Sequence, residues 1–482
     1  MRNGLVYVFL LLGSLVAGCS NYLDVVPKDK QTQEQLFATR SGFYAAVNGI
    51  YNRLALDALY GRNMSYEMID LLALRYSPTV STGTMVAATL SWDYTNSYLK
   101  STISTVWSSA YQTILNCNVV LDNLDKQQEV LTEEEARLIR GEMLAVRAFL
   151  HFDMLRMFGP MYAENPKAEA IPYNESIKVM NLPLLAADSV LEYRILRDLN
   201  AAEQYLVADP VVEGGPMASA DEEGGEAYLR YRQLRFNYYA VLALKARVLL
   251  YAGNRSEARE AALRLLDDPA VKSHFPSVDP ARLLGNSQTP DRVFSTEVLM
   301  GIYKNNRADI FTYSFDDENV GSVVLKPKNN YIVNNLFAGE TADYRYQSQW
   351  GTGSFVKYKK LIVSDENNLP FYARLMPLIR LSEMYYIVAE CEKELSERYD
   401  RLNEIRGLRG VPALPVVSEE DFTQRLRTEY LREFYGEGQL FFMFKRMGTT
   451  LTSSENGYNN NSYALTAVRF VVPLPEDEIA YR

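Results

Sequence analysis

Long stretches of this chain carry apolar residues at helical spacing, and this periodicity limits the possible folds more than any other feature. The most regular stretch is a pair of segments, 231–252 and 255–267, separated by Gly253. Apolar residues recur on one face of each segment, and the glycine between them is a typical helix terminator. Small alanines, a glycine-containing turn and a second amphipathic helix resemble a tetratricopeptide unit. We therefore predict a helical hairpin here.

The same periodicity recurs elsewhere, although it fits the tetratricopeptide period only loosely. We expect further helices at about 41–54, 103–124, 132–158, 187–206, 376–397 and 418–443. Thr132 and the glutamates after it resemble a capping box, and Gly159 and Pro160 stop the helix that begins there. About four helix pairs stacked as a short solenoid would bury a continuous core between neighbours. The predicted fold class is mainly α, with a tetratricopeptide-like helical scaffold.

About a third of the chain lacks helical periodicity. Residues 60–100 and 270–375 are rich in Tyr, Asn, Ser, Thr and Gly, and they contain short strand-like runs such as 321–325. We predict irregular, loop-rich, partly β inserts here. Because loops on a rigid scaffold usually carry binding residues, a ligand site is expected in these inserts. The helical scaffold itself is expected at about 41–59, 101–267 and 376–445.

The N-terminus has the pattern of a bacterial export signal. Arg2 precedes an apolar run at 5–16, and the small residues Ala17 and Gly18 lead into Cys19. The run has about twelve residues, whereas a helix needs roughly twenty to cross a bilayer, so we do not expect a transmembrane anchor. The last residues resemble a lipobox, whose cysteine is lipidated after cleavage. An ordinary cleaved signal with an incidental cysteine is the alternative.

This pattern divides the chain into three parts. Residues 1–18 are predicted to be a lipoprotein signal peptide, and residues 19–40 a lipid anchor at Cys19 followed by a tether. Residues 41–482 are predicted to form a single domain. No later stretch of the sequence is long and apolar enough to suggest a membrane span. We therefore expect an extracytoplasmic protein that is held to a membrane by its lipid.

Composition argues against several classes of function. The formal net charge of −10 disfavours nucleic-acid binding, which needs a basic patch, and adhesion to an anionic membrane surface. Two histidines, His151 and His274, leave little for a zinc site or for histidine-based catalysis. No P-loop or dinucleotide-binding glycine pattern is present, and the acidic run 316–318 lacks the spacing of a calcium loop, so no cofactor or metal is predicted. Cys117 and Cys391 are predicted to be buried free thiols, with a disulfide as the alternative.

Charged residues on the helical segments allow a catalytic and a structural interpretation. Arg380, Glu383 and Glu390 share one side of the helix expected at 376–397. Glu383 and Glu390 would lie two turns apart, about 10 Å along the axis, which is long for the acid–base pair of a glycoside hydrolase. Arginine and glutamate at helical spacing more often form ion pairs, so we predict structural roles and no enzymatic activity. The same prediction covers Glu429, Glu433 and Arg446.

Aromatic residues in the inserts are the candidate ligand contacts. Trp92 and Tyr94 alternate along one polar insert, and Tyr344, Tyr346 and Trp350 lie in the other. Aromatic faces stack on sugar rings, while neighbouring polar side chains can hydrogen-bond the sugar hydroxyls. The alternative is that these rings fill small cores beneath long loops. Exposure of both tryptophans around one cleft would favour ligand capture, and burial of both would favour a protein-docking role.

Eight short motifs add a resemblance to a known family. They occur in order at 22–27, 107–118, 147–159, 377–390, 402–406, 429–438, 445–448 and 472–479. Together they are similar to the motifs of the SusD/RagB family of outer-membrane lipoproteins from Bacteroidota. The chain departs from the family at Met443, where an acidic residue usually follows Phe441-Phe442, and it has no asparagine–proline tail. A starch-like ligand is therefore not assumed.

The resemblance implies a fold, a partner and a location. It implies a tetratricopeptide-like scaffold with a variable insert face, in a lipid-anchored protein at the surface of the outer membrane. It also implies a partner, a SusC-type TonB-dependent transporter barrel, which the lipoprotein would cover as a lid while delivering a glycan. The alternative function is a structural or peptide-docking subunit without glycan binding. Glycan, glycopeptide and peptide all remain open as ligands.

Overall fold

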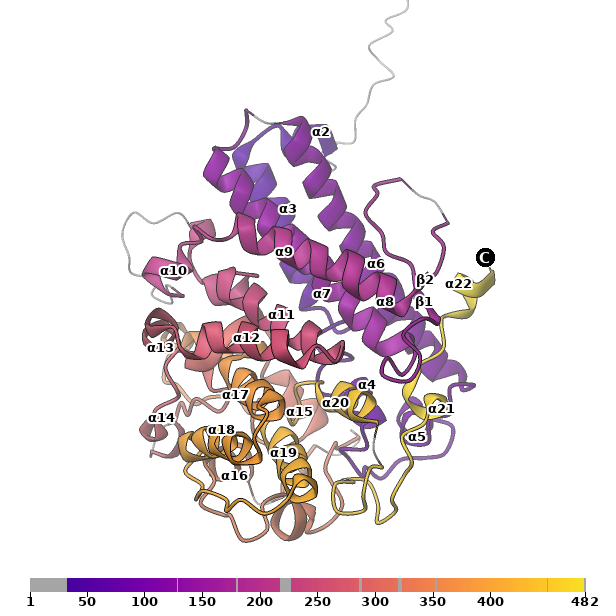
Figure 1. The fold of residues 1–482 in the computed structure, drawn as a ribbon, viewed down its shortest axis with the longest axis vertical. Helices are drawn as coiled ribbons and strands as arrows, with labels where there is room; N and C mark the ends of the chain where they lie inside the picture. The colour runs from indigo at the N-terminus through magenta and orange to yellow at the C-terminus, as the bar shows by residue number, and fades with distance from the viewer. Residues whose placement is uncertain are drawn as a thin grey trace, which may run out of the picture.

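The computed structural model describes residues 33–480 except for 128, 179–180, 217–226, 286–287, 320–322, 352 and 449. The predicted signal peptide, Cys19 and most of the tether lie outside the described residues. The longer helices form the scaffold (Figure 1). They are α3 (Arg40–Leu54), α6 (Ser97–Lys126), α7 (Glu133–Phe158), α9 (Leu196–Tyr205), α11 (Tyr238–Tyr251), α12 (Arg255–Leu266), α17 (Leu381–Cys391), α18 (Leu395–Leu408), α19 (Glu419–Glu433) and α20 (Leu440–Met447).

Successive scaffold helices pack against one another (Figure 1). Helix α6 contacts α3 and α7, α7 contacts α9, α11 contacts α12, α12 contacts α17, and α17 contacts α18. Each apolar face is thereby buried against a neighbour, as in a solenoid of helix pairs. The predicted mainly α, tetratricopeptide-like fold class is confirmed.

Local capping explains where several of these helices begin and end. The hydroxyl of Thr132 accepts the N–H of Glu135 at 3.2 Å, and the Glu135 carboxylate accepts the N–H of Thr132 at 3.0 Å, which is the predicted capping box. Asn237 caps α11 by accepting the N–H of Ala240 at 2.9 Å. Helix α11 therefore begins at Tyr238 and not at 231 as expected, because the chain before it follows a short 3-10 turn.

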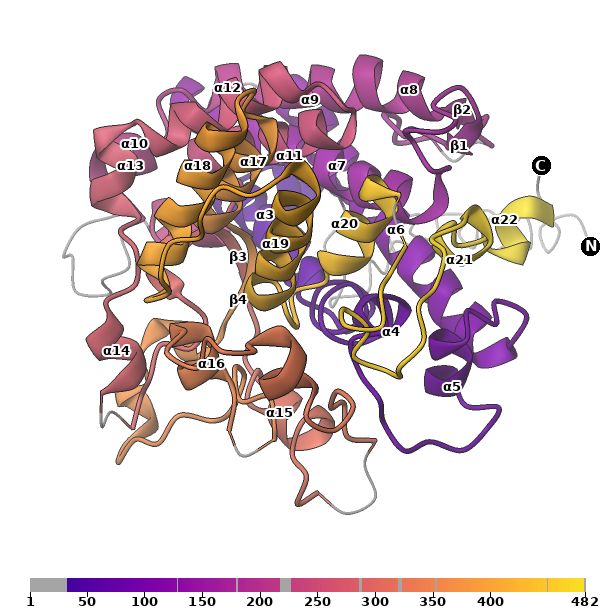
Figure 2. The ribbon, with the colours of Figure 1, turned by 60° about the horizontal axis from the view of Figure 1, so that its bottom comes forward.

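The inserts consist of short helices, loops and one small sheet. Strand β3 (Val298–Tyr303) pairs antiparallel with β4 (Leu375–Arg380). Figure 2 shows α14, α15 and α16 gathered on the side of the molecule opposite α8, α9 and α12. The short helices of the inserts are α4 (Met68–Leu72), α5 (Met85–Leu90), α13 (Pro269–His274), α14 (Pro280–Leu284), α15 (Asp309–Ser314) and α16 (Tyr344–Gln349).

Further short elements lie between the scaffold helices and near the ends of the described chain. A second two-stranded sheet pairs β1 (Glu169–Ile171) with β2 (Leu185–Ala186). The remaining α-helices are α2 (Gln33–Phe37), α8 (Ala187–Val190), α10 (Val211–Gly214), α21 (Ala467–Phe470) and α22 (Glu476–Ala480). The 3-10 and π turns are η2 (Leu191–Ile195), η3 (Ala227–Leu229), η4 (Arg232–Leu234), η5 (Ser295–Glu297), η6 (Ile332–Leu336), η7 (Glu366–Asn368) and η8 (Phe371–Ala373).

The continuous helix expected at 376–397 is wrong. Its first residues form strand β4, in which every side chain is buried and Pro377 lies opposite Gly301. A proline in a helix interior removes one hydrogen bond and clashes with the preceding turn, whereas a short buried apolar run suits a strand equally well. Gly301 permits the close pairing, because a Cβ there would lie 2.7 Å from Leu375 Cδ1. The expected helix is also interrupted at 392–394, between α17 and α18.

Three other expected elements differ from the structure. The helix expected at 418–443 divides into α19 and α20 at a turn where Gly436 and Gly438 have φ of +74° and +71°, a backbone region that favours glycine. The run 321–325 shows no strand in its described residues, and the strand of that insert is β3. The helix expected at 187–206 is interrupted by the π turn η2.

The two described cysteines are free and buried. Cys117 lies in α6 and Cys391 ends α17. Burial raises the pKa of each thiol to about 12, so both stay protonated at neutral pH. The prediction of buried free thiols is confirmed.

Asp70, on α4, is a buried carboxyl with few partners. Its Oδ2 accepts the N–H of Gly436 at 2.9 Å and the hydroxyl of Tyr76 at 3.4 Å. Its Oδ1 has no hydrogen-bond partner among the described residues. Burial raises the pKa of Asp70 to about 7, although the positive charge of Arg75 acts in the opposite direction.

The stability of the protein is expected to fall as the pH rises through about 7 because of Asp70. The folded state holds the Asp70 proton more tightly than the unfolded chain does. Protonated Asp70 therefore stabilises the fold fully below the pKa that it has in the unfolded chain, and this stabilisation is lost as the pH rises through its pKa in the folded state. The loss amounts to at most about 4 kcal/mol. Asp70→Asn should remove this pH dependence, which urea unfolding between about pH 5 and about pH 8 would measure. Parallel pH profiles for the two proteins would contradict the assignment.

Candidate functional site

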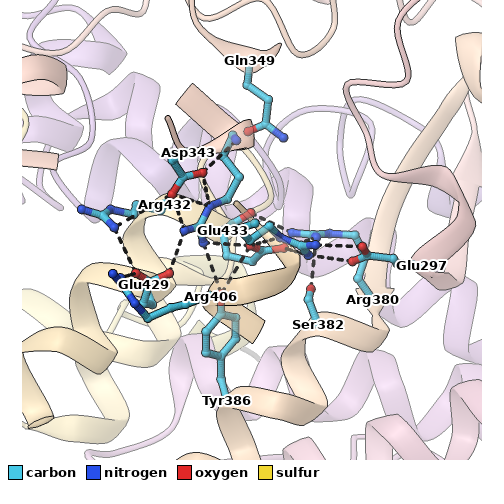
Figure 3. A network of polar contacts seen from close by, with 12 residues as sticks. Glu297, Asp343, Gln349, Arg380, Ser382, Tyr386, Arg406, Glu429, Arg432 and Glu433 are labelled. Atoms are coloured by element: carbon cyan, nitrogen blue, oxygen red, sulfur yellow. Dashed lines mark hydrogen bonds and ion pairs between the residues drawn. The ribbon is translucent and has the colours of Figure 1, made fainter. Parts of the chain in front are cut away.

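Helix α19 carries two buried carboxylates that gather arginines from distant segments (Figure 3). Glu433 accepts hydrogen bonds from Arg345 at 3.0 Å and from Arg409 at 2.7 and 3.0 Å. It also pairs with Arg380. Glu429, one turn earlier, accepts from Arg345 at 2.7 Å. The same network includes Glu297, Asp343, Arg406 and Arg432.

The arginines keep both carboxylates of α19 ionised. Burial acts to raise the pKa of Glu429, but three nearby guanidinium groups outweigh it and lower that pKa to about 2. The pKa of Glu433 is likewise held well below its usual range by Arg409, Arg380 and Arg345, against the effect of burial. A general acid at neutral pH needs a raised pKa, so the geometry suits a structural role for these residues.

The other candidate glutamates also pair with arginines from different elements. Glu383 accepts two hydrogen bonds from Arg247 of α11, at 2.6 and 2.7 Å. Glu390 accepts two from Arg446 of α20, at 2.5 and 2.8 Å. Arg380 belongs to β4 and not to the helix that carries the glutamates, which corrects the expected shared helix face. These ion pairs therefore join the scaffold helices to one another and to the insert sheet.

The structure does not gather the five candidate aromatics around one cleft. Trp350 is only 8% exposed and packs edge to face on Tyr435, with ring centroids 4.9 Å apart. It belongs to an aromatic core beneath the insert loops and offers little surface to a ligand. Tyr344 and Tyr346 are partly exposed on α16, where Tyr346 packs on the ring of Phe337 at 5.4 Å.

Trp92 is held differently, in the turn that follows α5. Its φ of +53° is rare for a bulky residue, and such strained positions cluster at ligand sites. The indole N–H donates to the carbonyl of Leu72 at 3.1 Å, and the ring remains partly exposed. Tyr463 meets the indole edge to face at 5.2 Å, and the Arg469 guanidinium lies 5.2 Å from the indole and 5.3 Å from the tyrosine ring. We call Trp92, Tyr463 and Arg469 the Trp92 platform.

A polar loop at 456–463 borders this platform, and sequence reasoning did not single it out. The Asn456 side chain accepts a hydrogen bond from the backbone N–H of Tyr458 at 2.8 Å and donates one to the side-chain oxygen of Asn459 at 2.8 Å. Asn459 in turn donates to the hydroxyl of Tyr463 at 2.9 Å. The loop is thus organised by its own amides before any ligand arrives. Its sequence, NGYNNNSY, mixes amides and tyrosines, and this composition is the signal that could have identified it.

A groove of about 770 Å³ lies next to the platform, along the first half of α6. Tyr94 lines the groove, and its hydroxyl donates to the backbone carbonyl of Arg469 at 2.6 Å. Helices α5, α21 and α22 lie at this same end of the molecule (Figure 1 and Figure 2). One wall carries the hydroxyls of Ser101, Ser104, Thr105 and Ser108. The other wall carries Val468, Val471, Pro473, Leu474 and Ile479.

Two family models match the chain in succession. The first, described as starch-binding and associating with the outer membrane, matches residues 21–216. The second, described as the SusD family, matches residues 303–473. The chain belongs to the SusD/RagB family. This result confirms the resemblance carried by the eight sequence motifs, which fall largely inside the two matched ranges.

Individual SusD-like proteins resemble the chain over most of its length. A SusD-like protein of Formosa agariphila is 22% identical, over 84% of this chain and 81% of the relative. The crystal structure of a SusD superfamily protein from Bacteroides thetaiotaomicron has a TM-score of 0.69 at 20% identity, covering 92% of this chain and 98% of that one. A laminarin-binding SusD-like protein has a TM-score of 0.61 at 17% identity, covering 92% and 97%. At these identities the solved structures establish a shared fold.

The SusD/RagB assignment also bears on location. The first matching family model is described as associating with the outer membrane. In the part of the chain that the structure describes, no helix combines the length and the apolarity needed to cross a bilayer.

Proposed function

We propose that this protein captures a glycan at the cell surface, on the Trp92 platform and in the adjoining groove along α6. The observation that carries the proposal is the partly exposed indole of Trp92, held in a strained backbone beside a preorganised loop of asparagines. Aromatic faces stack on the apolar faces of sugar rings, and amides and hydroxyls bind sugar hydroxyls. The laminarin-binding relative supports a carbohydrate ligand. The groove, at about 770 Å³, has room for several sugar units.

We also propose that the protein takes part in transport across the outer membrane. Membership of the SusD/RagB family supports a SusC-type TonB-dependent transporter barrel as the partner, with this protein as its lid. A lipid on Cys19 would hold the lid beside the barrel, and the segment between Cys19 and α2 would act as the tether that lets it swing. The tether expected at 19–40 is thereby shortened, because Phe37 of α2 is buried against Phe43 of α3. Ligand binding would then favour the closed position, because a ligand shifts the equilibrium toward the state that it binds better.

Trp92→Gly is expected to weaken glycan binding at least tenfold, which corresponds to about 1.4 kcal/mol. Glycine accepts the left-handed backbone at this position, so the variant removes the ring without adding strain. Calorimetry of the chain cut after Cys19, against β-1,3-glucan and α-1,4-glucan oligosaccharides and a set of peptides, would measure the change. Tyr313→Ala is the matched control, because that tyrosine is exposed on α15 and belongs neither to the platform nor to the lining of the groove. Undiminished binding by the Trp92 variant would contradict the proposed site.

The alternative function, a protein-docking subunit, has one observation in its favour. The C-terminal wall of the groove exposes apolar side chains, and Val468 is 81% exposed. Exposed apolar residues beside a groove also suit a peptide ligand. Binding of peptides but of no glycan in the same calorimetric panel would favour this alternative.

A further inference from the structure

A second pocket, of about 300 Å³, lies away from the Trp92 platform. It opens between α3, the turn η4 and the end of β3 (Figure 1 shows α3). It shares no lining residue with the groove along α6 or with the platform. Its volume is at the lower end for small-molecule sites, which suits one ring-sized ligand better than an oligomer.

Two tyrosines at the edge of this pocket form an aromatic surface. Tyr231 has φ of +53°, which is rare for an aromatic residue, and its ring stacks on Phe371 with centroids 5.1 Å apart and planes 11° apart. Tyr303 lies 6.1 Å from the same phenylalanine and is 37% exposed. Arg374 fixes Tyr303 by donating to its hydroxyl at 3.0 Å. The pocket therefore holds Tyr231 in a strained backbone and keeps an aromatic face open to a ligand.

A buried arginine, Arg235, forms part of the opposite side of the pocket. Arg235 is 9% exposed, and its guanidinium lies 4.1 Å from the ring centroid of Tyr228. Its Nη2 donates to the side-chain oxygen of Asn48 at 2.6 Å. Its Nη1 is buried and forms an ion pair with Glu142, whose carboxylate oxygen lies 3.6 Å away behind the pocket. Asn52, exposed beside Asn48 on α3, adds a second amide to the lining.

The charges behind the pocket balance one another. Arg232 pairs with Glu142 and with Asp209, each at 2.7 Å, so with Arg235 there are two guanidinium groups and two carboxylates. The wall behind the pocket is therefore balanced in charge, and Arg230 adds one guanidinium group to the lining itself. The pocket offers aromatic faces together with neutral amides, which matches a ligand with an apolar ring face and several hydroxyls.

We propose that this pocket binds a single neutral pyranose ring, as a second carbohydrate site. The sugar would stack beside Tyr231 and Tyr303 and hydrogen-bond the side-chain amides of Asn48 and Asn52. The proposal does not depend on glycan capture at Trp92, because the two sites are built from different residues.

Saturation-transfer NMR with the methyl glycosides of glucose, galactose, mannose and xylose tests the second site. At least one glycoside should bind the wild-type protein, and Tyr231→Gly and Tyr303→Ala should each weaken that binding at least tenfold. Glycine suits the left-handed backbone at 231, and Tyr303 is exposed, so at least one of the two variants keeps the fold. Tyr193→Ala, which removes an exposed tyrosine from η2, is the matched control and should bind normally.

The same measurement on Trp92→Gly separates the two sites. Monosaccharide binding that survives in Trp92→Gly and is lost in the Tyr231 and Tyr303 variants supports the second site. Failure of all four glycosides to bind the wild-type protein would overturn it, as would binding that both tyrosine variants retain. Loss of monosaccharide binding in Trp92→Gly alone would assign the sugar to the platform and would also overturn the second site.

Discussion

Glu433→Gln is expected to lower the free energy of unfolding by about 3–5 kcal/mol, which is the usual loss when one partner of a buried ion pair is removed. The substitution keeps the size of the side chain but removes the charge that faces Arg345, Arg380 and Arg409. Their guanidinium groups are buried and cannot turn to water. A loss of this size is a large fraction of the 5–15 kcal/mol that stabilises a typical protein.

Urea unfolding followed by circular dichroism would measure the effect of Glu433→Gln. Glu404→Gln is the matched control, because Glu404 forms a surface pair with Arg401 at 3.2 Å, and such pairs contribute about 0–1 kcal/mol. Equal losses in the two variants would contradict the structural role of the network. The depressed pKa values of Glu429 and Glu433 also predict the direction in which stability changes with pH. Their stabilisation is present above the ordinary glutamate pKa and is lost as the pH falls through the depressed pKa of each group, which for Glu429 is about 2.

Cys19→Ala is expected to move nearly all of the protein from the membrane fraction to the soluble fraction. If lipid on this cysteine is the anchor, its removal leaves the described part of the chain with no helix that could replace it. Several acyl chains on one residue hold a protein stably, whereas none gives no anchoring. Labelled palmitate should be incorporated into the wild-type protein and not into the variant.

Cys117→Ala and Cys391→Ala are the controls for the lipid anchor, because both thiols are buried in the fold. Each control should keep its palmitate label and stay in the membrane fraction. Retention of Cys19→Ala in the membrane fraction would show that another part of the chain anchors the protein.

Features set by neighbouring residues were predictable from the sequence. The apolar spacing of Tyr238–Tyr251 and the capping residues around Thr132 act within a few positions, so periodicity and cap chemistry located both helices. Strand β4 was missed because a short buried apolar run satisfies helix and strand patterns alike, and its pairing with β3 depends on residues far away in the chain. Local rules therefore recovered the scaffold better than the inserts.

In the candidate site, too, the residue types were predictable from the sequence but their exposure and their contacts were not. Trp92 and Trp350 lie in similar polar sequences, yet the fold leaves one partly exposed and buries the other against Tyr435. The Trp92 platform needs Tyr463, which is brought beside the indole by tertiary packing. Likewise, the glutamates of α19 could be assigned to ion pairs from the sequence, but their partners could not be named. The sequence gives the type of each residue, whereas its burial and its contacts depend on segments that are distant in the chain.

The network around α19 also sets the order in which the chain can complete its fold. Arg380 of β4 leaves the ribosome before Glu433 and Glu437, the carboxylates that neutralise it, whereas Arg345 and Arg409 also pair with the earlier residues Asp343 and Glu297. Until Glu433 and Glu437 have been made, closing the core around Arg380 would bury an uncompensated charge. The insert sheet and the last scaffold helices must therefore assemble together and late, after residue 437 has been made.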